Sequence, residues 1–342
     1  NDRLEKESYI KKLFNDTGST EKDAKTIVNA LHNIMDDLYT NADDRFVYEL
    51  IQNADDQPRD GKNVTVNMQL LNKHLLFMHN GRPFDKDDIY SICDIGSSTK
   101  RNSKEKIGYK GIGFKSVFTG SDTVVVNSGN YSFAFDKDSP IYNDVNVENI
   151  PWQLKPIWQE KYRYPQEVRA NEYFWKSPVC ISLEIDESVV KHYDNSIRKI
   201  LSNPPFLLFL KNVNSICYQH ENNDFVVSKK TENNIVHITQ NGEIISSWTT
   251  SYFVVEIPQD VRDAMQNDRN VPQKMKEATK TKISFAAIIT DGQVGQLNNS
   301  VLYAYLPTSV NDFKFNFIVN ADFLLAANRE QLHTKKIWNQ FL

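Results

Sequence analysis

Cysteine is scarce in this chain. The 342 residues include three cysteines, Cys93, Cys180 and Cys217, and their odd number and wide spacing argue against a disulfide framework. Neither these cysteines nor the seven histidines show the short spacings of a zinc site. We therefore expect no zinc, a reducing compartment and a cytoplasmic location.

Long apolar runs are also missing. The stretch "PPFLLFL" at 204–210 is far shorter than the roughly 18 apolar residues that span a bilayer. The charged start "NDRLEKESYIKKLF" is unlike a signal peptide. We therefore expect no membrane partner. Neither sign of charge prevails, since 40 Lys and Arg stand against 44 Asp and Glu. This balance argues against a footprint for nucleic acid over the whole protein.

Glycine is sparse as well, yet the few glycines cluster. Of 12 glycines, three fall within "KIGYKGIGFKSVF" at 106–118, namely Gly108, Gly111 and Gly113. Glycine lets a backbone approach a ligand closely, and a helix that begins at "FKSVF" would point its free amides at an anion. Six basic residues and one acid between Lys100 and Lys115 give this segment a local charge of +5. We therefore favour a phosphate site over plain packing of a helix start. The spacing fits neither a P-loop nor a Rossmann turn.

The order of elements predicts an α+β chain of two domains. A chain of this length exceeds one typical hydrophobic core, and we place the boundary near residue 190. Hydrophobic periodicity predicts helices in residues 1–58, a hairpin of strands at 64–70 and 74–79, and a helix at 84–95. Further strands are expected at 123–128, 131–136 and 179–185, with an irregular stretch at 140–178. In the second domain the strongest signals are strands at 283–290, 300–307 and 313–319.

The helix predicted at 43–57 has a polar face opposite its apolar stripe. At 100° per residue, Glu49, Asn53 and Asp56 of "ELIQNADD" share one narrow face. A solvated helix side is the plain alternative. A carboxylate one turn from an amide also suits a metal–nucleotide site, because the carboxylate can orient a water and the amide oxygen can bind Mg²⁺.

Four segments in this order resemble one known family. They are "ELIQNADD", "FMHNGRPF", "DIGSSTK" and "KIGYKGIGFKSVF", and the chain from about 35 to 136 resembles the ATP-binding domain of the GHKL superfamily. Within that superfamily, the sequences of these segments are most similar to those of the sacsin and NO VEIN branch. The resemblance implies a Bergerat-type α/β sandwich over residues 1–190, with a helical segment at 1–40 and an ATP lid at 96–113. It implies a mixed α/β, transducer-like middle domain over residues 191–342, and a chain that is the amino-terminal part of a longer protein.

The resemblance also implies a role for individual residues. Glu49 would be the general base, Asn53 would bind Mg²⁺, and Asp56 would lie near the base or ribose of ATP. The mobile part of the lid would run from Gly96 to Lys106. The ATP-binding residues implied by these motifs are Gly96, Ser97, Ser98, Lys100, Gly108, Lys110, Gly111, Ile112, Gly113 and Phe114.

The segment "HNGRP" departs from the family pattern. Chaperone-type members have an Asp that accepts the adenine amino group, whereas this chain has His79 at that position, and Gly81 is the residue that matches. Asn80 could accept the same hydrogen bond through its amide oxygen, so the choice between His79 and Asn80 stays open. The usual Thr at the start of a late strand is missing, and Ser177 is the nearest hydroxyl.

A second signature lies near the end of the chain. "NADFLLAANREQLHTKKIWNQFL" at 320–342 resembles the stretch of the sacsin-like branch in which an Arg reaches the γ-phosphate, and Arg329 is placed accordingly. The plain alternative is an exposed Arg at a helix start capped by Asn328. If Arg329 reaches the phosphate, hydrolysis depends on closure of the two domains.

We expect a slow Mg²⁺-dependent ATPase whose lid and domains move with nucleotide. One alternative is an ATP-binding scaffold with degenerate hydrolysis. Another is a defence or repair ATPase linked to nucleic acid, which we do not favour because the basic segment also suits a phosphate lid. A protein client or a homodimer stays open as a partner.

Overall fold

The computed structural model describes residues 2–39, 45–94, 110–268, 271, 273–297, 300–325 and 332–342. What the sequence predicts for residues outside these ranges remains a prediction. The described residues form two compact units, which we treat separately. Among the described residues, unit 1 contains 2–94, 110–199 and 216–225, and unit 2 contains 200–215 and those from 226 onward. The division lies ten residues after the boundary expected near 190, and a later segment returns to unit 1.

Helices dominate the start of unit 1, as the periodicity predicts. They are α1 (Asp2–Asp16), α2 (Glu21–Tyr39) and α3 (Arg45–Asp55). Thr20 caps α2, because its hydroxyl accepts a hydrogen bond from the amide of Asp23 at 3.1 Å. Later in the chain come α4 (Lys86–Ile92), α5 (Lys110–Lys115) and α8 (Val190–Leu201).

The strands of unit 1 form a largely antiparallel sheet. Each pair from β1 through β2, β6, β3 and β4 to β5 is antiparallel, and β7 lies beside β1. Gly129, with a φ of 57°, makes the turn between β3 and β4 that the sequence indicates. The strands are β1 (Val64–Leu70), β2 (His74–His79), β3 (Thr123–Ser128), β4 (Tyr131–Asp136), β5 (Ile157–Trp158), β6 (Val179–Glu184) and β7 (Val213–His220).

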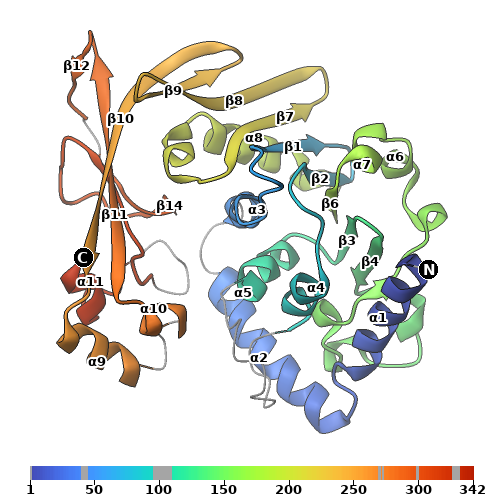
Figure 1. Ribbon diagram of the computed structural model, residues 1–342. Helices are drawn as coiled ribbons and strands as arrows, with labels where there is room; N and C mark the ends of the chain where they lie inside the picture. Colours follow the sequence, from blue (N-terminus) through green and yellow to red (C-terminus); the bar gives the residue numbers. More distant parts are fainter. Residues whose placement is uncertain are drawn as a thin grey trace. The chain divides into compact units, whose positions relative to one another are not determined.

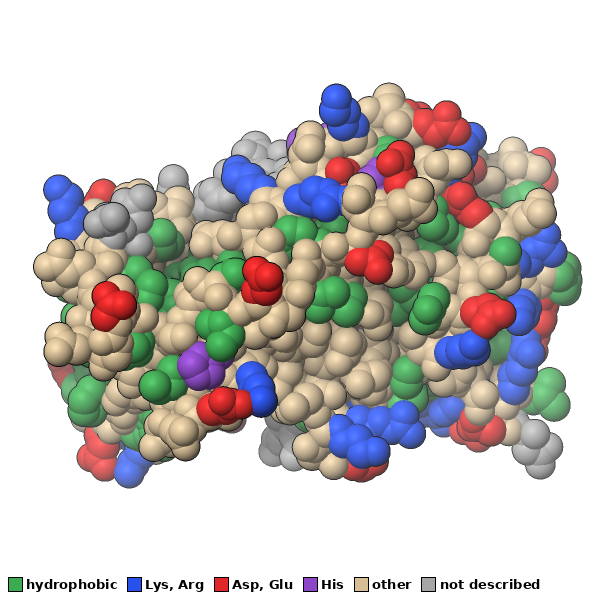
Figure 2. All heavy atoms as spheres, turned by 90° about the horizontal axis from the view of Figure 1, so that it is seen from above, with side chains coloured by type: hydrophobic (Ala, Val, Ile, Leu, Met, Phe, Trp, Pro, Cys, Tyr) green, Lys and Arg blue, Asp and Glu red, His purple; other side chains and the backbone are tan. Residues whose placement is uncertain are grey.

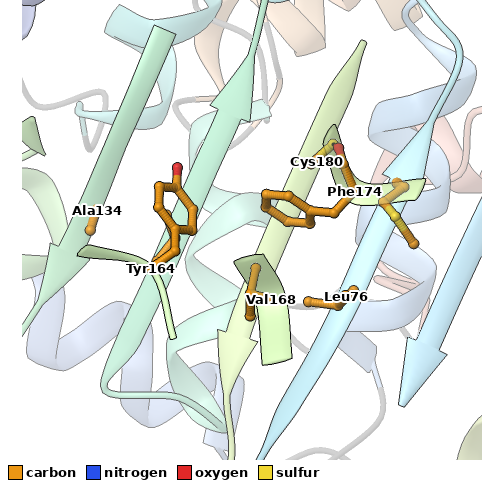
Figure 3. Packing of buried hydrophobic residues seen from close by; sticks show 8 residues of the cluster. Leu76, Ala134, Tyr164, Val168, Phe174 and Cys180 are labelled. Carbon is orange, nitrogen blue, oxygen red and sulfur yellow. The ribbon is translucent and has the colours of Figure 1, made fainter. Parts of the chain in front are cut away.

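Each face of this sheet is covered by a different set of helices (Figure 1). The short helices α6 (Gln166–Arg169) and α7 (Glu172–Lys176) cover one face. Figure 3 shows Tyr164 and Phe174 lying over the sheet beside Val168 and Leu76, in a cluster of buried side chains. Helices α3, α4 and α5 cover the opposite face, where α5 contacts both of the others. Because strand side chains alternate between faces, Phe77 and His79 point to the face opposite that of Leu76.

Unit 2 is built on a second run of paired strands. Their order is β8, β9, β10, β11, β15, β13, β14, with β12 beside β11, and the β13–β15 pair is parallel. A separate cluster of buried side chains packs α9 (Gln259–Asn267) and α10 (Gln273–Glu277) with α11 (Ile337–Phe341). The strands are β8 (Asn223–Glu232), β9 (Ile235–Gln240), β10 (Glu243–Glu256), β11 (Lys280–Thr290), β12 (Gln293–Val294), β13 (Leu302–Ala304), β14 (Leu306–Pro307) and β15 (Ile318–Asn320).

Helices and strands coexist without regular βαβ alternation, so the expected α+β class is confirmed. The strand predicted at 313–319 is wrong for most of its length, because β15 begins at Ile318. The alternating aromatic residues Phe313, Phe315 and Phe317 stack on one another, with ring centroids 5.5 and 5.2 Å apart. Lys314, with a φ of 48°, breaks the extended backbone between them. Tyr305, also at positive φ, divides the strand predicted at 300–307 into β13 and β14.

Across the described ranges, no helix is both long and apolar enough to cross a bilayer.

One lysine of the basic segment is buried. Lys115 at the end of α5 is fully covered, and its ammonium donates a hydrogen bond to the carbonyl of Ile92 in α4. It also lies 5.9 Å from the ring centroids of Phe114 and Phe135. Burial lowers the pKa of Lys115 to about 8, although nearby Cys93 and Asp94 oppose the shift. Lys115 therefore ties α5 to α4.

This burial predicts a pH-dependent contribution of Lys115 to stability. Between pH 8 and 10.5 the unfolded chain holds a proton that folded Lys115 releases, so the free energy of unfolding should rise with pH in this window. Relative to Lys115→Met, the wild type should gain up to about 1.4 kcal/mol per pH unit. Urea denaturation at several pH values measures this difference, with Lys176→Met at an exposed lysine as the control. A constant difference between wild type and Lys115→Met would contradict the assignment.

Candidate functional site

A cavity opens on the helical face of the unit 1 sheet. It lies between α3, the end of β2, α4 and α5, and has a volume of about 460 Å³ with its open mouth included. Its inner part has room for only a few water molecules. The apolar wall consists of Leu50, Phe77, Phe84, Ile92, Phe114 and Ile181. The polar lining consists of Asn53, Gln57, His79, Asp88 and Ser91.

Three of the motifs singled out in the sequence meet at this cavity. Asn53 comes from "ELIQNADD" on α3, His79 from "FMHNGRPF" at the end of β2, and Phe114 from the glycine-rich segment in α5. They are separated by 26 and 35 positions in the sequence. The pairing of β2 between β1 and β6 and the packing of α5 against α3 and α4 bring them together.

Helix α3 supplies a shorter polar face than its periodicity predicts. The helix ends at Asp55, so the face shared by Glu49 and Asn53 does not continue to Asp56, which is exposed and lies outside the cavity lining. The cause is Pro58, because the proline ring disfavours the helical conformation in the residue that precedes it, here Gln57. Gln57 instead closes a tight turn, with its amide donating to the carbonyl of Ala54 at 3.1 Å. Glu49 is buried, with 4% of its surface exposed, and is not among the residues that line the cavity.

His79 is held in one protonation state. Burial lowers the pKa of His79 to about 3, so the imidazole is neutral at physiological pH. Its Nδ1 accepts a hydrogen bond from the Gly81 amide at 3.2 Å. In a neutral imidazole the other nitrogen then carries the proton, which makes Nε2–H a donor. A carboxylate at this position would be an acceptor, so His79 reverses the hydrogen-bonding character expected from the family pattern.

Asn80 turns away from the cavity. It is exposed, its side-chain oxygen accepts a hydrogen bond from the Thr65 amide at 2.7 Å, and its amide nitrogen donates to the Asn63 carbonyl at 3.5 Å. These bonds tie the end of β2 to the start of β1. Of the two residues proposed to contact the base, the structure brings His79 to the cavity and not Asn80.

Gly81 packs directly against the turn that follows α3. A Cβ at Gly81 would lie 2.4 Å from the Gln57 carbonyl oxygen and 2.8 Å from Nδ1 of His79. The next amide, that of Arg82, donates to the same carbonyl at 3.1 Å. A glycine is required here because any side chain would push α3 and β2 apart.

The carboxylate in the cavity wall is already engaged. Arg82 donates to both oxygens of buried Asp88, at 2.6 and 3.1 Å. Asp88 also accepts from the Asp85 amide at 3.0 Å, while Asp85 accepts from the Asp88 amide, which is a capping box at the start of α4. The Asp88 carboxylate therefore stabilises the turn between β2 and α4, and we do not assign it to ligand binding.

Several predicted site residues lie outside the described ranges, so their placement stays a prediction. These are Gly96, Ser97, Ser98, Lys100, Gly108 and Arg329. Lys110, Gly111, Ile112 and Gly113 lie in α5, and only their backbone placement bears on the site.

Within the ranges described above, no group of three or more His, Cys, Asp or Glu side chains is placed to hold a metal ion. Mg²⁺ often takes one or two protein oxygens and completes its shell with phosphate and water. The Asn53 side-chain oxygen on the cavity wall is a suitable ligand of this kind.

Sequence reasoning missed three polar residues of the cavity, Gln57, Asp88 and Ser91. Asp88 carries a signal that could have been used, because "DKDD" after a strand has the spacing of a capping box. Gln57 has a weaker one, its place directly before Pro58, which predicts that the helix ends there.

Comparisons with known proteins agree with the resemblance inferred from the motifs. Residues 24–180 match the family model of the Sacsin domain. Protein NO VEIN of Arabidopsis thaliana is 26% identical over 332 residues, covering 94% of this chain and 11% of that protein. Sacsin of Homo sapiens is 33% identical over 115 residues, covering 31% of this chain and 2% of that protein. The expected similarity to the sacsin and NO VEIN branch is confirmed, and the chain spans about a tenth or less of either relative.

The close approach at Gly81 predicts a steric penalty. Gly81→Ala should destabilise unit 1 by about 1–3 kcal/mol, because the new methyl group meets backbone that cannot swing aside. Urea denaturation measures the loss. The control is Gly61→Ala, where no atom lies within 4 Å of the added Cβ and the φ of +68° supplies the backbone penalty alone. A Gly81→Ala variant as stable as the wild type would show that α3 and β2 can separate freely.

The neutral state of His79 predicts acid sensitivity. Between pH 6.5 and about pH 3, His79 binds a proton in the unfolded chain and stays neutral in the folded chain. The free energy of unfolding should therefore fall as pH drops through this window. The wild type should lose up to about 1.4 kcal/mol per pH unit relative to His79→Gln. Urea denaturation from pH 7 to 4.5 tests this, with His32→Gln at an exposed histidine as the matched control. Parallel losses in wild type and His79→Gln would refute it.

Proposed function

We propose that unit 1 binds Mg-ATP at the cavity between α3, β2, α4 and α5 and hydrolyses it slowly. The observation that carries the proposal is the meeting of Asn53, His79 and Phe114 at one cavity, each from a different motif. The match of residues 24–180 to the Sacsin domain supports the same reading, because the motifs lie within that range. The Bergerat-type fold and the GHKL assignment are part of this proposal.

The chain's own residues would divide the work as follows. Asn53 would hold Mg²⁺, which when bound would supply positive charge next to the phosphates. Glu49, one turn earlier on α3, accepts a proton from the attacking water. The amides of Gly108, Gly111 and Gly113 would contact the phosphates, as the resemblance implies. The Phe114 amide, which the resemblance adds to them, lies inside α5, because this helix begins at Lys110 and not at the "FKSVF" segment.

Motion belongs to the proposal as well. ATP would close the lid at 96–113. Arg329 would contact the phosphates only when the two units close on each other, and hydrolysis would let the units open again. The module would then act as a nucleotide-dependent switch within a longer, chaperone-like protein. A client protein or a second copy of the chain would read out the switch.

The altered base position favours a second candidate, an ATP-binding scaffold with little hydrolysis. His79 replaces an acceptor by a donor, so the nucleotide would be held differently from that of the chaperone-type members. Calorimetric titration with Mg-ATP beside a phosphate-release assay separates the two functions.

A role with nucleic acid receives less support. Lys115, one of six basic residues in the segment 100–115, is buried and bonded to Ile92, so it offers no charge to a phosphate backbone. On the face shown in Figure 2, Lys and Arg side chains lie among Asp and Glu. We therefore retain the nucleotide as the anionic ligand.

The catalytic assignment predicts separable effects on turnover and binding. Glu49→Gln should lower phosphate release by about 10²–10⁴-fold and leave the Kd for Mg-ATP nearly unchanged, because a general base acts in the chemical step. Asn53→Ala should weaken Mg-ATP binding itself. The control is Glu148→Gln at an exposed carboxylate. Unchanged turnover in Glu49→Gln would remove Glu49 from the mechanism, and binding without turnover in the wild type would favour the scaffold.

A further inference from the structure

The side chain of Gln57 presents a buried acceptor without a partner. Gln57 is 4% exposed and lines the cavity. Its Oε1 is buried and makes no hydrogen bond within the described part of the chain. Buried polar atoms are nearly always paired in folded proteins, because an unpaired one costs free energy. The turn after α3 nevertheless fixes Gln57 in place through its own carbonyl, which accepts from Arg82.

The ring of His79, which lines the same cavity, presents a donor. Its Nδ1 is taken by the Gly81 amide, so Nε2–H is the group left for a ligand. Gln57 and His79 are close neighbours, since the Gln57 carbonyl and the His79 Nδ1 both lie within 2.8 Å of the position that a Gly81 Cβ would take. The cavity therefore holds one fixed acceptor and one fixed donor at its polar end.

Of the other polar residues of the cavity wall, Asn53 is assigned to Mg²⁺ in the proposed function, and Asp88 and Ser91 are committed elsewhere. Both oxygens of Asp88 bind Arg82, and the Ser91 hydroxyl donates to the Asp87 carbonyl at 2.9 Å. The rest of the wall is apolar and includes the rings of Phe77 and Phe84. An apolar slot with one donor and one acceptor suits a flat heterocycle that offers the complementary pair along one edge.

We propose that Gln57 and His79 together read the base of the bound nucleotide, with the adenine amino group donating to Gln57 Oε1 and an adjacent ring nitrogen accepting from His79 Nε2–H. This inference rests on the proposed nucleotide binding. Adenine carries its 6-amino group beside a ring nitrogen on either side, N1 or N7, so either edge fits the pair. The base enters by parting the side chains at the narrow inner end of the cavity. Side-chain changes of this kind commonly accompany binding.

This recognition differs in chemistry from recognition by a carboxylate. A carboxylate offers acceptors alone and demands a donor from the base. The Gln57–His79 pair demands a donor and an acceptor side by side, and neither protein group carries a charge. Both the amino group and one ring nitrogen of adenine should therefore contribute to affinity.

Nucleotide analogues test the pair in the wild-type chain without any variant. Calorimetry should show that purine riboside 5′-triphosphate, which lacks the 6-amino group, binds about 3- to 10-fold more weakly than ATP. One of 1-deaza-ATP and 7-deaza-ATP should lose affinity by a similar factor, and which one identifies the edge. If all three analogues bind as tightly as ATP, the base-reading pair is overturned.

Gln57→Leu tests the acceptor directly, with Gln52→Leu in α3 as the matched control outside the cavity. The variant should bind ATP about 3- to 10-fold more weakly and no longer distinguish ATP from purine riboside triphosphate. Its urea midpoint without nucleotide should not fall, because Oε1 has no hydrogen bond to lose. Equal ATP affinity in Gln57→Leu and wild type would overturn the inference and leave nucleotide binding standing. Failure of the wild type to bind any of the nucleotides would overturn the proposed function itself, and the base-reading pair with it.

Discussion

The contact between the turn after α3 and the end of β2 governs the whole cavity. The Gln57 carbonyl accepts from the Arg82 amide at 3.1 Å, and Gly81 leaves no room for a side chain between them. This contact sets the spacing between a helix and a strand that belong to different motifs. Asn53 and His79 face one cavity because their elements are joined at this point. A substitution there would change the site without touching any ligand-binding side chain.

The turn between β2 and α4 transmits this constraint to the rest of unit 1. Asp88 binds Arg82 with both oxygens and caps α4, and the Phe84 amide donates to the buried Ser128 hydroxyl of β3 at 2.8 Å. Lys115 then ties α5 to the end of α4. Asp88 and Lys115 thus serve the framework. In the proposed site, the groups that would contact the base are the amide of Gln57 and the neutral imidazole of His79.

The sequence predicts the local elements of this framework better than it predicts the site. Strand β1 and helix α3 follow from strict periods of two and of 3.6 residues, and the turn residues after β1 indicate that the chain runs back as β2. The prediction of a strand at 313–319 is wrong for most of that range because the alternating Phe side chains stack their rings on one another along a bent backbone. The long strands β8 and β10 carry a weak period, since many of their side chains are exposed on both faces. Hydrophobic periodicity arises when one face of a strand is buried, so it does not reveal a strand that has no buried face.

The site itself could be predicted only in part, because its chemistry depends on tertiary contacts. The motifs identify Asn53, His79 and the glycine-rich segment, but not that Asn80 turns to β1 or that Gln57 is buried. The character of His79 is likewise a product of the fold, since the Gly81 amide determines which ring nitrogen keeps the proton. In a narrow, largely apolar cavity a carboxylate would be costly unless it were paired, as Asp88 is with Arg82. An amide and a neutral imidazole avoid this penalty. The base pocket that we propose could therefore remain dry without a compensating cation, and the positive charge of the segment 100–115 would be left for the phosphates.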